Sequence, residues 1–224
     1  SLQNFRTQAE LAGMDEAAAY AAALRELAQR LAGHTPLPPI RRLVALHASS
    51  RSTSNTLALW DLVRRNLDGV AIREFGLRNG TVMDCIGCSY SACLHYGERG
   101  GCFYGGVMTE EVFPAILDCD ALVMLCANYN DALSANLTAC VNRLTALYRR
   151  TRFYDKRLYG LVVSGYSGGD LVAQQLISAL NMNKSFYLPP YFSLLETAND
   201  AGSLVKLPGV AQRAADFAAR MLAH

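Results

Sequence analysis

The chain has 224 residues, of which 51% are hydrophobic and 18% are charged, and its net charge is +2. This composition is typical of a globular protein, excludes a largely disordered chain, and gives no reason to expect nucleic-acid binding. No apolar run is long enough to cross a bilayer, and the N-terminal residues lack a signal-peptide pattern. We therefore expect no membrane partner and a cytoplasmic location, where the seven cysteines would be reduced thiols.

The N-terminal segment reads as an addition to the main domain. Residues 14–31 are rich in alanine and carry three leucines along one face, which predicts an amphipathic helix. Gly33 and the prolines of 36–39 end this helix and form a short, stiff link. We divide the chain into a helical arm with a Pro-rich link, residues 1–39, and a main domain, residues 40–224. The apolar stripe of the arm fits packing on its own domain or on a second subunit.

The main domain shows alternating strand and helix patterns. The expected strands are 42–47, 70–75, 121–127, 158–164 and 185–192. Helices are expected after Ser54 and over 110–117, 133–144, 171–180 and 210–222, whereas the stretch 76–108 is expected to be irregular. Repeating strand–helix units produce a mostly parallel sheet with helices on both faces.

Three polar or small-residue turns follow the ends of expected strands, at 48–55, 127–131 and 164–169. In parallel sheets ligands bind beyond the carboxyl ends of the strands, so these turns are the candidate site. The first turn is rich in hydroxyl groups, contains one arginine and precedes a helix, whose N-terminus offers unpaired N–H donors. This pattern favours a phosphate site, and an ordinary surface turn with a Ser or Thr cap is the alternative.

The same three turns resemble a known family. The first resembles the phosphate loop of the flavodoxin-like NADPH-dependent FMN reductase family in its run Ser49-x-Arg51-x-x-Ser54-Asn55-Thr56, with Ala48 where a glycine is usual. The second is similar to the family's Pro-x-Tyr segment, with Ala127 in place of the proline, and the third is similar to its last flavin loop. The resemblance covers roughly residues 42–193.

This resemblance implies an α/β flavodoxin-like three-layer sandwich with a five-stranded parallel sheet in the order 2-1-3-4-5, the arm being an extra N-terminal helix. It also implies bound FMN. The residues carried over for the phosphate are Ser49, Arg51, Ser54, Asn55 and Thr56. Those carried over for the isoalloxazine ring are Ala127, Asn128, Tyr129, Asn130, Ser164, Gly165 and Gly168.

Four cysteines in the irregular stretch form a second motif, Cys-x2-Cys-x4-Cys-x8-Cys, at Cys85, Cys88, Cys93 and Cys102. The stretch resembles iron–sulfur flavoproteins, a branch of the same broad family whose usual motif is tighter, and so implies a [4Fe–4S] cluster. Four thiolates also suit zinc, and free thiols are the third alternative. The remaining cysteines fall on apolar patterns and are expected in the core.

The resemblance implies an FMN-dependent oxidoreductase. NAD(P)H would deliver a hydride to the flavin, and the reduced flavin would pass electrons to a quinone or a similar small-molecule acceptor. The flavin performs this chemistry, so we assign no catalytic acid or base. The alternatives are an electron carrier without its own NAD(P)H turnover, with or without a cluster, and a zinc-stabilised or cofactor-free binding module. The resemblance also implies a homo-oligomer, typically a dimer.

Overall fold

The computed structural model describes residues 2–33, 35–49, 53–78 and 80–223. The chain forms two compact units, residues 1–37 and residues 38–224, and each is described by itself. No helix among the described residues combines the length and the apolar character that crossing a membrane requires.

The first unit is a helical arm, which confirms the expected extra helix at the N-terminus. It consists of a 3-10 turn (Leu2–Phe5), α1 (Arg6–Ala12) and α2 (Glu16–Ala32). Gly13 ends α1 with a φ of 63°, a left-handed conformation that glycine adopts at little cost. Asp15 begins α2, because its carboxylate accepts a hydrogen bond from the backbone of the first turn at 2.8 Å.

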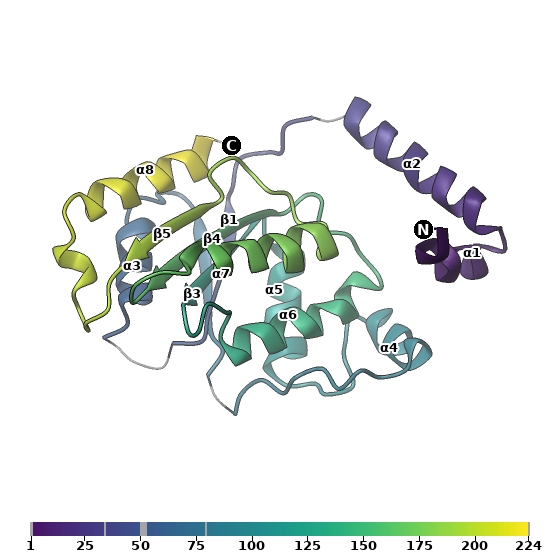
Figure 1. Cartoon of the computed structure of the whole chain (residues 1–224), viewed down its shortest axis with the longest axis horizontal. Coiled ribbons are helices and arrows are strands. Elements are labelled where there is room, and N and C mark those ends of the chain that lie inside the picture. The colour runs from purple at the N-terminus through teal and green to yellow at the C-terminus, as the bar shows by residue number, and fades with distance from the viewer. Residues whose placement is uncertain (1, 34, 50–52, 79, 224) are drawn as a thin grey trace. The chain divides into compact units, whose positions relative to one another are not determined.

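The second unit contains a five-stranded parallel sheet in the order β2-β1-β3-β4-β5, which confirms the expected flavodoxin-like topology (Figure 1). The strands are β1 (Arg42–His47), β2 (Ala71–Gly76), β3 (Ala121–Ala127), β4 (Arg157–Ser164) and β5 (Ser193–Thr197). The order changes direction between β1 and β3, and parallel sheets bind ligands at such a switch point.

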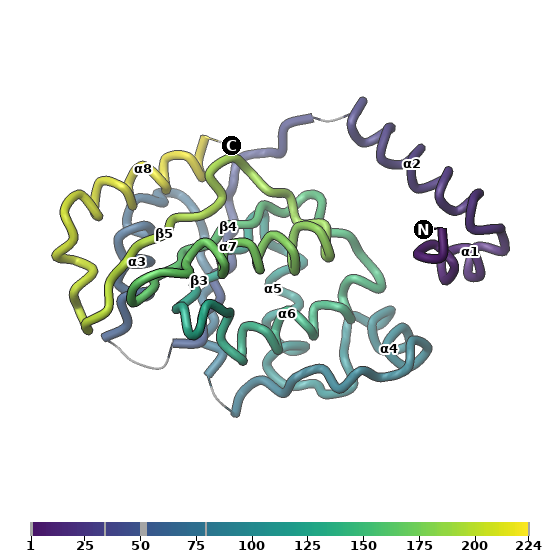
Figure 2. The backbone as a smooth tube through the Cα atoms, viewed as in Figure 1, coloured from purple at the N-terminus to yellow at the C-terminus, as the bar shows by residue number. Residues whose placement is uncertain are grey.

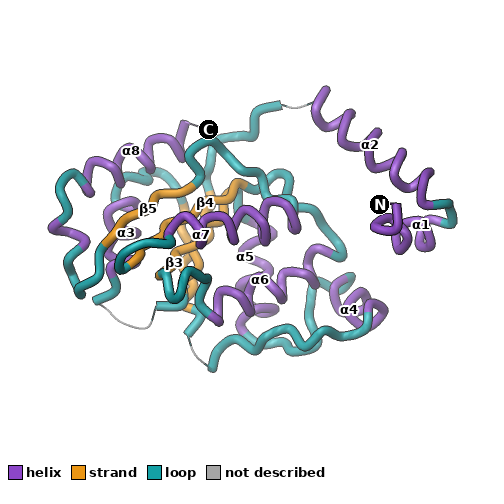
Figure 3. Tube along the Cα trace, in the orientation of Figure 1, coloured by secondary structure: helices purple, strands orange, loops and turns teal. Residues whose placement is uncertain are grey.

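Helices cover both faces of this sheet (Figures 2 and 3). They are α3 (Asn55–Arg64), α4 (Tyr90–Gly97), α5 (Phe113–Asp118), α6 (Ala135–Tyr148), α7 (Gly169–Leu176) and α8 (Val210–Ala223). Met108–Val112 and Ile177–Met182 form π-helical turns that adjoin α5 and α7, and Leu204–Lys206 is a 3-10 turn. The expected helices over 110–117, 133–144, 171–180 and 210–222 are therefore present with bounds shifted by a few residues.

The alternation of side chains along the central strands assigns the two faces. In β1, Leu43 and Ala45 join a buried cluster that contains Trp60 of α3 and side chains of α8. Val44 and Leu46 point to the opposite face and join a cluster with α5, α6 and α7. Burial of each large apolar side chain contributes about 1.5–3 kcal/mol. The sheet is consequently fixed from both sides, and the turns at its carboxyl edge are held in place.

The expectation of a fifth strand at 185–192 is wrong, because β5 is Ser193–Thr197. Within 185–192 the structure has an isolated bridge between Tyr187 and Arg157 and no ladder. Pro189 and Pro190 have no N–H to donate to β4, and Tyr191 has a positive φ of 54°. The chain therefore joins the edge of the sheet one segment later than the apolar pattern predicts.

The stretch 76–108 is also more regular than expected, because it contains α4. Ser89 caps this helix by accepting a hydrogen bond from the N–H of Ala92 at 3.3 Å. Gly97 lies at its C-terminal end, and a Cβ there would lie 2.4 Å from the carbonyl oxygen of Ala146 in α6. The absence of a side chain at Gly97 thus lets α4 pack closely on α6.

Candidate functional site

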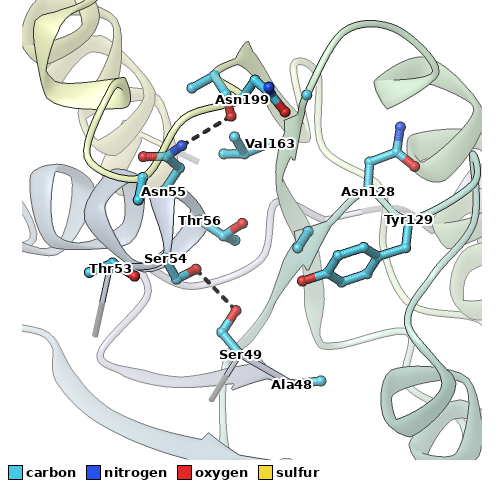
Figure 4. Close-up of a pocket in the computed structure, with 14 residues that line it drawn as sticks. Ala48, Ser49, Thr53, Ser54, Asn55, Thr56, Asn128, Tyr129, Val163 and Asn199 are labelled. Carbon is cyan, nitrogen blue, oxygen red and sulfur yellow. Dashed lines mark hydrogen bonds between the residues drawn. The ribbon is translucent and has the colours of Figure 1, made fainter. Parts of the chain in front are cut away.

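A cavity of about 580 Å³ lies at the carboxyl edge of the sheet (Figure 4). This volume falls within the range of about 300–1,000 Å³ that is usual for small-molecule sites. The cavity is lined by Ala48, Ser49, Thr53, Ser54, Asn55, Thr56, Ala127, Asn128, Tyr129, Val163, Gly165, Ala198, Asn199 and Ala201. The three turns predicted from the sequence therefore meet at one site, and a fourth turn, after β5, joins them.

The N-terminus of α3 forms one wall of the cavity. Ser54 caps the helix: its Oγ accepts from the N–H of Leu57 at 3.4 Å and donates to Ser49 Oγ at 3.1 Å (Figure 4). Among the described residues, the N–H groups of Asn55 and Thr56 have no hydrogen-bond acceptor. These free donors and the helix dipole favour an anion at this wall.

The predicted site residues divide into three groups. Those that line the cavity are Ser49, Ser54, Asn55, Thr56, Ala127, Asn128, Tyr129 and Gly165. Asn130, Ser164 and Gly168 lie in the same turns but do not line it. Arg51 lies outside the described residues. The lining side chains are all uncharged, so within the described part of the chain the anion would be bound by amides and hydroxyl groups.

The side chain of Asn55 is used inside the protein. Its Nδ2 donates to the carbonyl oxygens of Ala198 at 3.0 Å and Asp200 at 2.8 Å, which belong to the segment that follows β5. Its Oδ1 accepts from the N–H of Leu204 at 3.4 Å. The amide of Asn55 therefore holds this segment against α3, and what the residue offers to the cavity is its backbone N–H.

Asn128 joins the second and third turns. Its Nδ2 lies within hydrogen-bond distance of Ser164 Oγ (3.1 Å), Ser167 O (2.8 Å) and Asp131 Oδ1 (3.2 Å). Gln175 of α7 supports the same pair of turns, since its Nε2 donates to Asp131 O at 3.0 Å. The two turns that border the cavity on the β3–β4 side are consequently connected by side-chain hydrogen bonds.

Gly168 permits this contact between the turns. It has a φ of 80°, and a Cβ at this position would lie 1.6 Å from Asp131 Oδ1. Gly165 has a similar relation to the fourth turn, because a Cβ there would lie 2.9 Å from Asn199 Oδ1. At Gly168 the positive φ and the contact with Asp131 both require a glycine, whereas at Gly165 a rotation of the Asn199 side chain makes room for a Cβ.

Sequence reasoning missed the fourth turn, of which Ala198, Asn199 and Ala201 line the cavity. The turn follows β5, and placing the fifth strand at 185–192 moved the expected carboxyl end of that strand away from it. The dipeptide Asn199-Asp200 is a turn signal that could have located it. Thr53 was also missed, although it lies in the first turn.

His47, at the end of β1, is buried beside the site and does not line it. Its Nε2 lies 3.5 Å from Glu74 Oε1. Burial lowers the pKa of His47, and the nearby carboxylate of Glu74 opposes that effect. We therefore assign His47 a structural role at the junction of β1 with β2.

The four motif cysteines line a second cavity, of about 140 Å³, formed by α4, the segments before and after it, and α6. Its lining residues are Cys85, Gly87, Cys88, Ala92, Cys93, Tyr96, Cys102, Phe103, Tyr104, Asn142, Arg143, Thr145, Ala146 and Arg149. The guanidinium groups of Arg143 in α6 and of Arg149, directly after α6, thus share a cavity with four thiols. The 85–102 motif is spread over 18 positions of the sequence, and the fold brings all of its cysteines to one cavity.

This arrangement does not match a site for a single metal ion. Among the described residues, no group of three or more His, Cys, Asp or Glu side chains could hold one ion. All seven cysteines are free. Burial raises the pKa of Cys119, Cys126 and Cys140 to about 12, so these thiols stay protonated in the core, as expected from the sequence.

Fold and site together define a flavodoxin-like protein whose cavity suits a phosphorylated ligand. Residues 41–200 match the profile of the NADPH-dependent FMN reductase family, and the chain belongs to that family. A search of curated proteins finds no match.

Solved structures with the same fold have low sequence identity to this chain. RosB with bound 8-demethyl-8-formylriboflavin-5'-phosphate is 15% identical with a TM-score of 0.61, over 82% of this chain and 77% of that one. The NADH:FMN oxidoreductase EMOB in its apo form is 16% identical with a TM-score of 0.56, over 82% and 89%. An NAD(P)H:quinone oxidoreductase from Methanothermobacter marburgensis is 14% identical with a TM-score of 0.55, over 84% and 98%.

The close contact at Gly168 leads to a first prediction. Replacing Gly168 by alanine strains the backbone by about 1–3 kcal/mol and forces Asp131 away from Asn128. We expect the affinity for FMN, measured by calorimetric titration, to fall about tenfold or more. Gly69→Ala is the matched control, because Gly69 has a φ of 76° with open space around its Cα. Equal FMN affinities in the two variants would contradict the role assigned to Gly168.

Proposed function

We propose that the protein is an FMN-dependent NAD(P)H oxidoreductase that passes electrons to a quinone or a similar small-molecule acceptor. Family membership supports the flavin and the nicotinamide donor. The observation that carries the proposal is the cavity at the start of α3, where serine hydroxyls and N–H groups with no acceptor in the described part of the chain face a space of suitable volume. NAD(P)H as donor and the free cysteines also support a cytoplasmic location.

The residues present fit FMN at both of its ends. The phosphate dianion would accept hydrogen bonds from the N–H groups of Asn55 and Thr56 and from the hydroxyl of Ser49, which Ser54 Oγ holds in place by donating to it. The ring would lie against the turns that begin at Ala127 and Ser164, which Asn128 holds together. Tyr129 lies across the cavity from Ser54 and Thr56, on the side of the turns after β3 and β4 (Figure 4).

When bound, the flavin supplies the hydride and electron chemistry. The chain's own residues bind it and orient it, and the interlocked turns limit the movement of the ring. Tyr129 lines the cavity and is exposed, and Tyr166, which follows the lining residue Gly165 in the turn after β4, is exposed as well. These two aromatic side chains would border the open side of the cavity, where a nicotinamide and an acceptor could each reach the ring.

The function is tested by reduction of the bound flavin. Protein loaded with FMN is mixed with NADPH or NADH without oxygen, and the visible absorption of the flavin is followed. We expect rapid bleaching by one of the two donors and return of the colour on adding a soluble quinone. A flavin that stays oxidised with both donors would contradict the proposed NAD(P)H oxidoreductase.

The wall formed by Ser49 and the N-terminus of α3 is proposed to bind the phosphate, and a substitution there tests this role. In Ser49→Ala, one hydrogen bond to a charged group is lost, worth about 1.5–3 kcal/mol, so the FMN affinity should fall by about tenfold to a hundredfold. Riboflavin, which lacks the phosphate, is the control ligand and should bind the variant and the parent protein equally. An equal loss for both ligands would indicate damage to the fold, and no loss for FMN would place the phosphate elsewhere.

A second candidate, an electron carrier with an iron–sulfur cluster, is favoured by the convergence of the four motif cysteines on one cavity. Thiols distributed around a cavity suit a cluster, which binds one thiolate at each corner, better than they suit a single zinc ion. Cys85, Cys88, Cys93 and Cys102 would be the ligands, and the cluster would supply one-electron transfer. Arg143 and Arg149 would offset its negative charge.

The cluster is tested by analysing iron and acid-labile sulfide in protein purified without oxygen. We expect comparable amounts of iron and sulfide, lost in Cys88→Ser, while the core substitution Cys126→Ser serves as the control and retains them. Iron-free protein after reconstitution with iron and sulfide would contradict the cluster. That result would leave the flavin proposal unaffected, since the two cavities share no lining residue.

A further inference from the structure

We propose that the N-terminal arm associates with the arm of a second copy of this chain, with the two α2 helices antiparallel. The apolar face of α2 carries Tyr20, Leu24, Leu27 and Leu31, at spacings of four, three and four residues. These spacings are those of a coiled-coil seam. The inference is independent of the flavin proposal, because it uses only the first unit.

Among the described residues of the first unit, nothing buries the four side chains of this seam. The exposed fractions are 41% for Tyr20, 46% for Leu24, 48% for Leu27 and 72% for Leu31. Leu11 and Met14, at the turn between α1 and α2, are exposed as well. A contiguous line of large apolar side chains, on a helix whose other residues are alanine or polar, marks an association surface.

The arm has almost no core of its own. Among its described hydrophobic residues, Ala9 and Ala19 are the buried ones, and both are small. The ring of Phe5 contacts that of Tyr20 edge to face at 5.3 Å between centroids, which ties the first turn to α2. Units of fewer than about 40 residues usually need another surface to be stable, so this hairpin needs a partner for its seam.

The spacing of the seam makes it complementary to itself. The midpoint between Tyr20 and Leu31 coincides with the midpoint between Leu24 and Leu27. When a second α2 is placed antiparallel about that point, Tyr20 faces Leu31 of the other copy and Leu24 faces Leu27. Each apolar side chain then meets an apolar side chain, as a two-fold interface between identical chains requires.

The charges along α2 favour the antiparallel direction. Its start carries Asp15 and Glu16, and its second half carries Arg25, Glu26 and Arg30. The start is therefore negative and the second half is positive on balance. An antiparallel pair brings unlike ends and unlike helix-dipole ends together, whereas a parallel pair brings like ends together.

The test is the mass of the full chain in solution, measured by sedimentation velocity and light scattering at micromolar concentrations. Leu24→Glu/Leu27→Glu places charges in the seam and keeps good helix formers on α2. We expect this variant to have half the assembled mass of the parent protein. Leu24→Met/Leu27→Met keeps the seam apolar and should retain the full mass.

A second variant, Leu31→Glu, guards against misfolding, because this side chain is the most exposed of the four. It should weaken the assembly at least tenfold in dissociation constant while the far-ultraviolet circular dichroism stays unchanged. A parent protein that is monomeric would overturn the proposal, as expected if the seam packs on the chain's own second unit. A glutamate variant with the parent's mass would overturn it too, because association would then use another surface.

Discussion

The start of α3 has N–H groups that no acceptor among the described residues satisfies, and the candidate site is organised around them. A helix N-terminus that faces a cavity is stabilised by an anion. The anion accepts hydrogen bonds from the N–H groups of the first turn and interacts favourably with the helix dipole. Ser54 fixes where the helix begins, and Ser49 extends the donor set to the end of β1. The order of the strands then places this wall at the switch point between β1 and β3.

The remaining walls of the cavity are held by side chains that act within the protein. Asn55 attaches the segment after β5 to α3 through two carbonyl oxygens. Asn128 connects the turn after β3 to the turn after β4, and Gly168 allows the two to approach. A ring-shaped ligand would therefore meet turns whose positions are already fixed, so that little ordering is required on binding.

Several of these features were accessible from the sequence because they are local. A hydroxyl-rich turn between a strand pattern and a helix pattern located Ser49, Ser54 and Thr56, and the buried run 121–127 located β3. The fifth strand was misplaced because Pro189 and Pro190, which have no N–H for the ladder, were treated as compatible with an edge strand, and Asn199 was lost with it.

The partners of Asn55 and Asn128 could not be predicted, since their contacts join residues that are far apart in the chain. The helix α4 was missed because it has only eight residues, too few to show a clear period, in a stretch rich in glycine and cysteine. The convergence of the cysteines depends on this helix and its close packing on α6 through Gly97. The spacing of the cysteines in the sequence identified the four thiols as candidates, but it could not show that they share one cavity.

The most direct measurement of the central claim is the response of individual backbone amides to ligand. The protein is labelled with ¹⁵N, and its amide spectra are recorded while FMN, and separately inorganic phosphate, are added. The N–H signals of Asn55 and Thr56 should show the largest shifts with both ligands, because the phosphate dianion accepts from them. Unchanged signals at Asn55 and Thr56 in protein saturated with FMN would contradict the account.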